Sequence, residues 1–382
     1  MSQIFIPAAF YRGGTSKGLF LHARDCPADP GARDAMLLSV LGSPDPYGRQ
    51  LDGMGGGTSS LSKAAIIGPP SRPDADVDYT FAQVAVAQPV VDWGANCGNL
   101  ASAVGPFAVD EGMIAVAGDS ALVRIHQVNT GKIIHARFPL KDGRAQVAGD
   151  FAIDGVAGTG ARIGLEFLSP AGTFTAGLLP SGRVLDVIAD AQGPVAASLV
   201  DATNPVAFVS ASDLGLQGTE SPDVMEADPV LMARLDRLRR AAGVMMGMAP
   251  APEAVGLANP KIAIVSAPAA FQALDGRTFG AETHDIAVRM VSMERAHRAV
   301  TLTGAMCLAA ACRIEGSLPH QLCRAGAPGA AVRIAHASGF IETGAQVVNE
   351  GSWQVTATTV YRTARRLMQG AVAMRPSGGG TP

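Results

Sequence analysis

The stretch DWGANCGNLASAVGPFA, residues 92–108, places a single cysteine where a glycine-containing turn leads into a run of small residues. Such a run, following a turn, predicts a helix that begins close to Cys97. A second stretch, TLTGAMCLAAACR at residues 301–313, has the same pattern in the other half of the chain. The two stretches together predict two similar domains, each presenting the N-terminus of a small-residue helix to a shared cleft.

Many other segments of the chain have the pattern of short strands separated by turn residues. VDYTFAQVAV (77–86) and WQVTATTVYRT (353–363) alternate apolar and polar residues, as half-buried strands do. Further helices are expected in residues 29–43, which begin with Asp-Pro and end near Gly42, in residues 228–247 and in residues 294–313. This mixture predicts an α+β fold and not a regular βαβ alternation.

Length and linker composition predict the domain boundaries. A chain of 382 residues is too long for one ordinary core. The loop at residues 178–187 is rich in turn residues, and we therefore expect domains at 1–184 and 185–370. Residues 371–382 end in PSGGGTP and are expected to form a flexible tail.

Composition excludes several classes of protein. Hydrophobic residues make up 48% and charged residues 16%, which is typical of a folded globular chain. A net charge of −3 argues against nucleic-acid binding. The sequence shows neither a signal-peptide pattern nor a long apolar run, so we expect a cytoplasmic protein that does not bind membranes. Its five cysteines lack CxxC spacing and suggest neither a disulfide framework nor a zinc site.

Cys97 is the first candidate for chemistry. A thiol at a helix N-terminus is favoured as thiolate by unpaired N–H groups and by the helix dipole. Asn96 and Asn99 can cap the helix or donate hydrogen bonds, and Gly98 lets the backbone approach a ligand closely. The alternative is a small buried side chain beside a cap, because free cysteines are commonly buried. The local pattern leaves both interpretations open.

Lys63 ends a glycine-rich segment, GRQLDGMGGGTSSLSKAAIIG, at residues 48–68. The segment is not a Walker A motif. Its backbone N–H groups and Ser60 can still face an anion, and Lys63 can bind a carboxylate or, when desolvated, act as a base. A flexible surface loop with a solvated lysine is the alternative.

Two further segments carry possible anion-binding groups. RGGTSKG (12–18) follows a predicted strand, and Arg12, Thr15, Ser16 and Lys17 can surround an anion, although a plain turn is the alternative. RMVSMERAHRAVTLTGAMC (289–307) predicts a second helix start at Thr303-Gly304-Ala305, near Arg289 and His297. We interpret His297 as a surface or core residue, and Cys307 and Cys312 as packing residues. The set of groups fits a small carboxylate substrate and cofactor-free proton transfer.

The combination of RGGTSKG, GSPDPYGRQLDGMGGGTSSLSK, VDWGANCGNLASAVGPFA and the late TARRLMQG resembles the methylaconitate isomerase (PrpF) family. The motifs run in the family's order from residue 6 to about residue 370. The resemblance implies a diaminopimelate-epimerase-like fold: two α+β domains, each a curved, mostly antiparallel sheet wrapped around a central helix, with the active site between them.

The resemblance also implies an activity, namely isomerisation of unsaturated di- and tricarboxylates without metal or cofactor. The family's functional lysine falls on Lys63 and its functional cysteine on Cys97. The expected substrate-binding residues are Thr15, Ser16, Lys17, Ser60, Asn96, Gly98, Asn99, Arg289, Thr303, Gly304 and Ala305. The epimerases that share this fold use one cysteine from each domain, but here threonine and glycine stand at the second helix start. We therefore expect a Lys63–Cys97 pair in place of two thiols.

Several alternatives stay open at this point. The glycine-rich loop resembles methylaconitate isomerases more than oxalomesaconate tautomerases, so 2-methylaconitate or a close aconitate analogue is the expected substrate. 4-Oxalomesaconate and methylitaconate are the alternatives, followed by an amino-acid epimerase and a non-catalytic carboxylate-binding protein. Either Lys63 or Cys97 can be the base. A homodimer is a further possibility.

Overall fold

The computed structural model describes residues 3–94, 96–292, 294–326 and 330–375. The chain divides into two compact units. Unit 1 comprises Met1–Leu165 and Tyr361–Pro382, and unit 2 comprises Glu166–Val360. The division therefore falls before the loop at 178–187, and unit 1 is discontinuous in sequence.

Unit 1 is built on a mixed sheet with strand neighbours β23–β1–β2–β3–β4–β6–β7. The pairs β2–β3 and β4–β6 are parallel, and the other neighbours are antiparallel. The strands are β1 (Ile4–Gly13), β2 (Ser16–His22), β3 (Lys63–Gly68), β4 (Val77–Val84), β6 (Ser120–Gln127), β7 (Lys132–Lys141) and β23 (Ala364–Met374), with shorter β5 (Val91–Asp92), β8 (Arg144–Ala145), β9 (Phe151–Ile153) and β10 (Val156–Gly160).

The helix α2 (Gly98–Asp110) lies at the centre of unit 1. Every residue from Leu100 to Val109 is buried, which explains why the sequence offers only small and apolar side chains there. Gly105 permits a close approach between α2 and β7, because a Cβ at this position would lie 2.6 Å from Cε1 of Phe138 on β7. The helix α1 (Pro30–Leu41) covers the other side of the strands and packs against β23, β4 and β5.

Unit 2 repeats this plan. Its sheet has the neighbours β12–β13–β14–β15–β18–β20–β21–β22, in which β14–β15 and β18–β20 are parallel. The strands are β12 (Asp186–Ile188), β13 (Val195–Asp201), β14 (Pro205–Ser210), β15 (Lys261–Ser266), β18 (Ile286–Ser292), β20 (Val332–His336), β21 (Gly339–Asn349) and β22 (Trp353–Arg362), with shorter β16 (Phe271–Gln272), β17 (Thr278–Phe279) and β19 (Arg295–Ala296). β11 (Ile163–Leu168) and β22 cross the boundary between the units.

The helix α5 (Leu302–Ala311) is the counterpart of α2, and all ten of its residues are buried. It packs against β13, β14, β20 and β21. The remaining helices of unit 2 are α3 (Pro222–Glu226), α4 (Pro229–Met245) and α6 (Leu318–Leu322). The expected helix over 294–313 was too long: β19 occupies its start, and α5 begins only where the Thr301 side chain accepts a hydrogen bond from the Gly304 amide.

The order of pairings shows that the two units are structural repeats. Both run antiparallel, parallel, antiparallel, parallel, antiparallel over β1–β2–β3–β4–β6–β7 and over β13–β14–β15–β18–β20–β21. In both, the buried helix follows the fourth of these strands. The predicted α+β class, with a mostly antiparallel sheet around a central helix in each of two similar domains, is confirmed.

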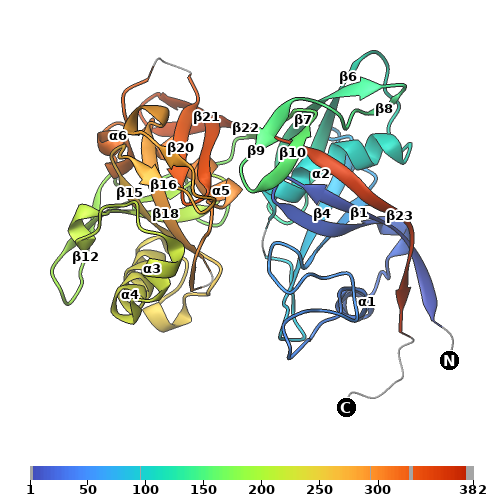
Figure 1. Cartoon of the computed structure of the whole chain (residues 1–382), viewed down its shortest axis with the longest axis horizontal. Helices are drawn as coiled ribbons and strands as arrows, with labels where there is room; N and C mark the ends of the chain where they lie inside the picture. Colours follow the sequence, from blue (N-terminus) through green and yellow to red (C-terminus); the bar gives the residue numbers. More distant parts are fainter. Residues whose placement is uncertain (1–2, 95, 293, 327–329, 376–382) are drawn as a thin grey trace. The chain divides into compact units, whose positions relative to one another are not determined.

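The C-terminal segment differs from the expected tail. Residues up to Met374 form β23, which pairs with β1 from Ile4↔Met374 to Gly13↔Ala364. Figure 1 shows this red strand running beside the blue β1. The alternation of residues 364–374 is weak because much of β23 is exposed, and pairing with a strand more than 350 residues earlier cannot be read locally. The last seven residues of the expected tail, 376–382, lie outside the described residues.

Candidate active site

The hairpin β1–β2 forms one wall of the candidate site in unit 1. Gly13 pairs with Ser16, so Gly14 and Thr15 make the turn. A Cβ at Gly13 would lie 2.6 Å from the Asn99 carbonyl oxygen, and one at Gly14, where φ is 51°, would collide with the Asn99 side chain. The two glycines therefore let the turn lie directly against the first turn of α2.

Cys97 lies at the start of α2, as the sequence predicts. It is the N-cap residue with φ −132° and ψ 95°, and its side chain makes no capping hydrogen bond. Its Sγ lies 3.9 Å from Oγ of Ser16, and the residue is 8% exposed. The thiol therefore lies at the positive end of the α2 dipole without forming a capping bond.

Lys63 is the first residue of β3, beside the start of β2 in the parallel pair. A Cβ at Gly18 would lie 2.8 Å from the Lys63 carbonyl oxygen, which shows how closely the two backbones approach. The Nζ atom donates to Oε1 of Gln83 at 2.6 Å and lies 5.0 Å from the centre of the Phe81 ring. Lys63 is only 8% exposed and is therefore not the solvated loop lysine of the alternative interpretation.

Two glutamines order the glycine-rich segment before Lys63. Gln50, 1% exposed, accepts a hydrogen bond from the Gly57 amide at 3.0 Å and donates to Oγ of Ser62 at 2.8 Å. Gln83 donates to the carbonyl oxygens of Ser59 and Ser62 at 3.0 and 2.9 Å. The segment is thus a bonded loop that fixes where Lys63 begins its strand. Sequence reasoning missed both glutamines; the alternation of VDYTFAQVAV puts Gln83 on the face of Phe81, but its partners are remote in sequence.

Asn99 ties the hairpin to α2. Its Nδ2 donates to Oγ1 of Thr15 at 3.1 Å, and its Oδ1 accepts from the Thr15 amide at 3.4 Å and from Nε of Arg362 at 3.1 Å. The side-chain amide of Asn99, which the sequence predicts to bind substrate, therefore forms hydrogen bonds within the protein. Arg362, which immediately precedes the TARRLMQG motif, is a residue that sequence reasoning missed.

The other predicted residues of unit 1 lie in the same region. The Lys17 amide donates to the Ser60 carbonyl oxygen at 3.0 Å, and Lys17 Nζ lies 5.9 Å from the centre of the Phe10 ring. Gly98 is the first residue of α2, and Asn96 is half-buried just before it. Nη1 of Arg12 donates to the carbonyl oxygens of Gly14 and Thr363 at 3.0 and 2.9 Å, which ties this side chain to the hairpin turn.

The four predicted residues of unit 2 each have a role within that unit. Arg289 is 2% exposed, and burial lowers the pKa of its guanidinium to about 10. It donates to the Glu220 and Val288 carbonyl oxygens at 2.6 and 2.9 Å. The Thr303 carbonyl oxygen accepts from Oγ1 of Thr203 at 2.7 Å.

The start of α5 differs from that of α2. The amide of Gly304 donates to Oγ1 of Thr301 at 3.2 Å, and the Ala305 amide donates to the Thr301 carbonyl oxygen at 2.8 Å. These two predicted anion donors are therefore already bonded. Thr301, and not residues 303–305, is the topological counterpart of Cys97, since both are the N-cap residues of the buried helices.

The thiol of Cys307 and the imidazole of His297 both form hydrogen bonds to the backbone of unit 2. Cys307 is fully buried, its Sγ donates to the Val200 carbonyl oxygen at 3.4 Å, and burial raises the pKa of the thiol well above its usual range. Nδ1 of His297 accepts from the Ala299 amide at 3.1 Å. The buried Cys307 thiol therefore does not serve as a second acid/base group in unit 2.

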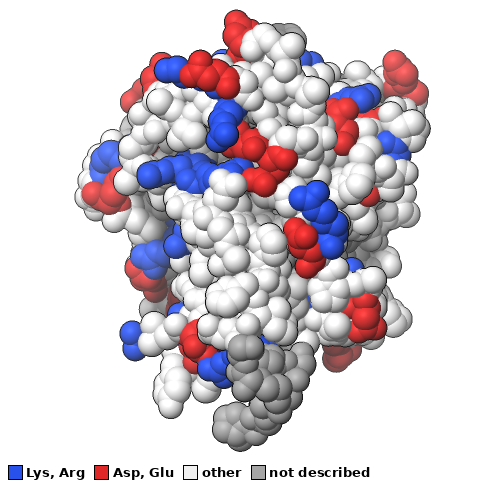
Figure 2. Space-filling view, turned by 90° about the vertical axis from the view of Figure 1, so that its right-hand side faces the viewer, with Lys and Arg blue, Asp and Glu red and all other residues white. Residues whose placement is uncertain are grey.

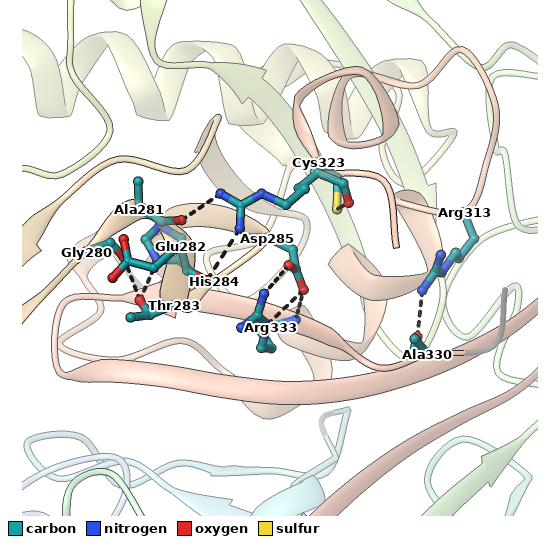
Figure 3. A network of polar contacts seen from close by, with 11 residues as sticks. Gly280, Ala281, Glu282, Thr283, His284, Asp285, Arg313, Cys323, Ala330 and Arg333 are labelled. Atoms are coloured by element: carbon teal, nitrogen blue, oxygen red, sulfur yellow. Dashed lines mark hydrogen bonds and ion pairs between the residues drawn. The ribbon is translucent and has the colours of Figure 1, made fainter. Parts of the chain in front are cut away.

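Charged groups outside this region form ion pairs and bonds to the backbone. In unit 2, Arg333 donates to Asp285 at 2.8 Å (Figure 3), and Arg324 donates to the Ala281 carbonyl oxygen at 2.9 Å. Figure 2 shows basic and acidic groups interspersed over the face it presents, with no extended area of one sign.

Within the described residues, no three His, Cys, Asp or Glu side chains are grouped so as to hold a metal ion, and no helix is both long and apolar enough to span a bilayer.

Two units of this topology define an epimerase-like α+β protein. A crystal structure of a hydroxyproline epimerase from Agrobacterium vitis shares the fold, with a TM-score of 0.56 and 16% identity over 98% of this chain and 95% of the other. The PrpF protein family model matches residues 3–375, and the chain therefore belongs to the PrpF family.

Several relatives are similar over almost their whole length. The chain is 41% identical over 374 residues to a 3-methylitaconate isomerase of Eubacterium barkeri and 41% identical over 385 residues to a 2-methyl-aconitate isomerase of Shewanella oneidensis, with 97% of each chain covered in both cases. It is 39% identical to a (4E)-oxalomesaconate Delta-isomerase of Novosphingobium, with 96% of each chain covered. A crystal structure of methylitaconate-delta-isomerase superimposes with a TM-score of 0.87, 39% identity and complete coverage of both chains.

Proposed function

We propose that this PrpF-family isomerase moves a proton across the allylic system of a small unsaturated di- or tricarboxylate, and that 2-methylaconitate or a close aconitate analogue is its substrate. Methylitaconate and 4-oxalomesaconate are the alternatives, and relatives that act on each of these compounds are of similar identity. The observation that carries the proposal is the placement of Lys63 and Cys97. Both are largely buried and border the same short segment of β2, at Gly18 and Ser16 respectively.

In the proposed reaction Lys63, as the neutral amine, takes a γ-proton from the carbon next to the C=C–COO⁻ unit. The C–H bond breaks, an N–H bond forms at Nζ, and the electron pair spreads into a dienolate. Gln83 Oε1 and the Phe81 ring then face the new ammonium group, and both stabilise positive charge. The developing negative charge on the substrate lies at the start of α2, whose dipole favours it.

Cys97 donates the second proton in this scheme. Its S–H bond breaks as a C–H bond forms at the other end of the allylic system, or at the original carbon after rotation about the intervening bond. The ammonium of Lys63 and the thiolate of Cys97 then exchange a proton through solvent, which restores both groups. Neither metal nor redox chemistry is needed for this balance of protons.

The test is incubation of the purified protein with each of the three candidate acids in D₂O, followed by ¹H NMR. Deuterium should enter the reprotonated carbon, which is the other end of the allylic system or, after rotation, the γ-carbon, at the rate of isomerisation or faster. The absence of both exchange and isomerisation with all three acids would overturn the proposal.

Two other functions stay less well supported. An amino-acid epimerase of this fold would need a second thiol at the start of α5, where Thr301 stands with its hydroxyl engaged by Gly304. A non-catalytic carboxylate-binding protein would show binding of polycarboxylates without exchange in the same D₂O experiment. The predicted homodimer and cytoplasmic location stay predictions; sedimentation and cell fractionation would check them.

A further inference from the structure

The side chain of Arg362, the last residue of β22, is buried against the hairpin of unit 1. Arg362 is 7% exposed, and burial alone lowers the pKa of its guanidinium to about 9. Nε donates to Oδ1 of Asn99 at 3.1 Å, and Nη1 donates to the Tyr361 carbonyl oxygen at 2.8 Å. A guanidinium has five N–H donors, so these two bonds use only part of its capacity.

The charge of Arg362 has no carboxylate partner in the part of the chain that the structure describes. The buried arginines of α4 contrast with it: Arg234 pairs with Asp190 at 2.8 Å and Arg239 with Asp236 at 2.8 Å. A buried cation without a counter-charge is costly in free energy, and proteins keep such groups mainly where they have a function. Amide and peptide oxygens satisfy two hydrogen bonds of Arg362 but leave its positive charge uncompensated.

The position of this charge relates it to the candidate active site. Asn99, its partner, lies two residues after Cys97 in the first turn of α2, and a Cβ at Gly14 would lie 3.0 Å from Cδ of Arg362. The guanidinium therefore lies at the turn whose next residue, Ser16, contacts the thiol of Cys97. It adds a full positive charge to a region where the helix dipole already favours an anion.

We propose that Arg362 binds one carboxylate group of the substrate, with Asn99 holding the guanidinium in place through Nε. This inference rests on the proposed function and adds to it a specificity-determining residue. A planar guanidinium with free N–H groups matches a carboxylate in bidentate geometry, which a lysine cannot reproduce. Arg362 thereby selects acids that carry a carboxylate at this position in addition to the one conjugated with the double bond.

The experiment measures binding of a non-reacting tricarboxylate, tricarballylate, by calorimetry. Arg362→Met should weaken the affinity roughly 10- to 100-fold, the range expected when a charged hydrogen-bonding group is removed. Arg365→Met is the matched control, because it removes one exposed positive charge from β23 close by and should leave the affinity within about twofold. Circular dichroism and melting temperature check that each variant is folded.

A second arm distinguishes direct binding from a structural role. The same titrations are made with the dicarboxylates that lack one or other carboxylate of tricarballylate. One of these should bind to wild type and to Arg362→Met with equal affinity, because it lacks the group that Arg362 holds. Equal weakening for every ligand would overturn the proposal, and so would unchanged binding of tricarballylate.

A measurement on the unaltered protein keeps the inference testable where Arg362→Met does not fold. The ¹H–¹⁵N signal of Arg362 Nε, assigned by its loss in Arg362→Lys, should shift when tricarballylate is added and should not shift with chloride. An unmoved signal at saturation would overturn the inference. Because these readouts need no turnover, they can succeed or fail independently of the D₂O exchange that tests the proposed function.

Discussion

Replacing Gln83 with methionine tests whether the orientation of Lys63 controls turnover. The Gln83 amide is fixed from both sides: Nε2 donates to the carbonyl oxygens of Ser59 (3.0 Å) and Ser62 (2.9 Å), so Oε1 faces Lys63 Nζ at 2.6 Å. Methionine has a similar length but makes none of these bonds. The bond to Nζ strengthens as Lys63 takes the proton, so its loss should lower kcat more than it raises KM.

The magnitude follows from the strength of such a bond. A hydrogen bond to a charged group contributes about 1.5–3 kcal/mol. Since about 1.4 kcal/mol corresponds to a tenfold change in rate, kcat of Gln83→Met should fall roughly 10- to 150-fold. Initial rates of isomerisation, together with deuterium incorporation measured by NMR, give kcat and KM separately.

Gln127→Met is the matched control. Gln127, 1% exposed on β6, donates to Oδ1 of Asn129 at 2.6 Å and accepts from the Thr130 amide at 2.9 Å. Its replacement removes comparable bonds without touching Lys63, so it should lower the melting temperature and leave kcat unchanged. A kcat for folded Gln83→Met within twofold of wild type would refute the reasoning, as would an equal loss of kcat in Gln127→Met.

Cys97→Ser should stay folded and lose roughly 10²-fold or more in kcat, because the hydroxyl is a far weaker acid than the thiol; near-wild-type turnover would remove the thiol from the mechanism. Lys63→Arg should bind tricarballylate in calorimetry but show no deuterium exchange, since guanidinium stays protonated, and substantial exchange would make Cys97 the better candidate for the base. Gly13→Ala should lower the free energy of unfolding in urea by about 1–3 kcal/mol, because the new Cβ would lie 2.6 Å from the Asn99 carbonyl oxygen; an unchanged midpoint would contradict the close packing of the hairpin. Activity should survive dialysis against EDTA, and restoration of a lost activity by one specific metal would contradict the cofactor-independent scheme.

Local signals in the sequence predicted α1, α2 and α4 well, whereas the helix expected over 294–313 was too long. The Asp-Pro pair and the glycine that bracket α1 act as expected: Asp29 accepts from the Ala32 amide at 2.7 Å, and Gly42 ends the helix with φ 73°. The run of small residues after Cys97 likewise predicted where α2 begins. These features depend on neighbours within a few residues, which a sequence pattern contains.

Long-range pairing could not be predicted in the same way. The chain leaves unit 1 along β11 and returns to it along β22, so the boundary loop at 178–187 lies inside unit 2. The partners of Gln83 and Arg362 are likewise remote in sequence. An alternating strand pattern shows which residues share a face, but it does not show which other segment that face meets.

The pairing of β1 with β23 has a consequence for how the protein is made. β1 leaves the ribosome first, and its antiparallel partner emerges only after all of unit 2. The sheet of unit 2 can therefore be completed during translation. The sheet of unit 1, which holds Lys63 and Cys97, still lacks its strand β23 at that stage. Premature termination just before residue 364 would thus leave unit 2 intact, although it is made later, and would disable unit 1 by removing β23.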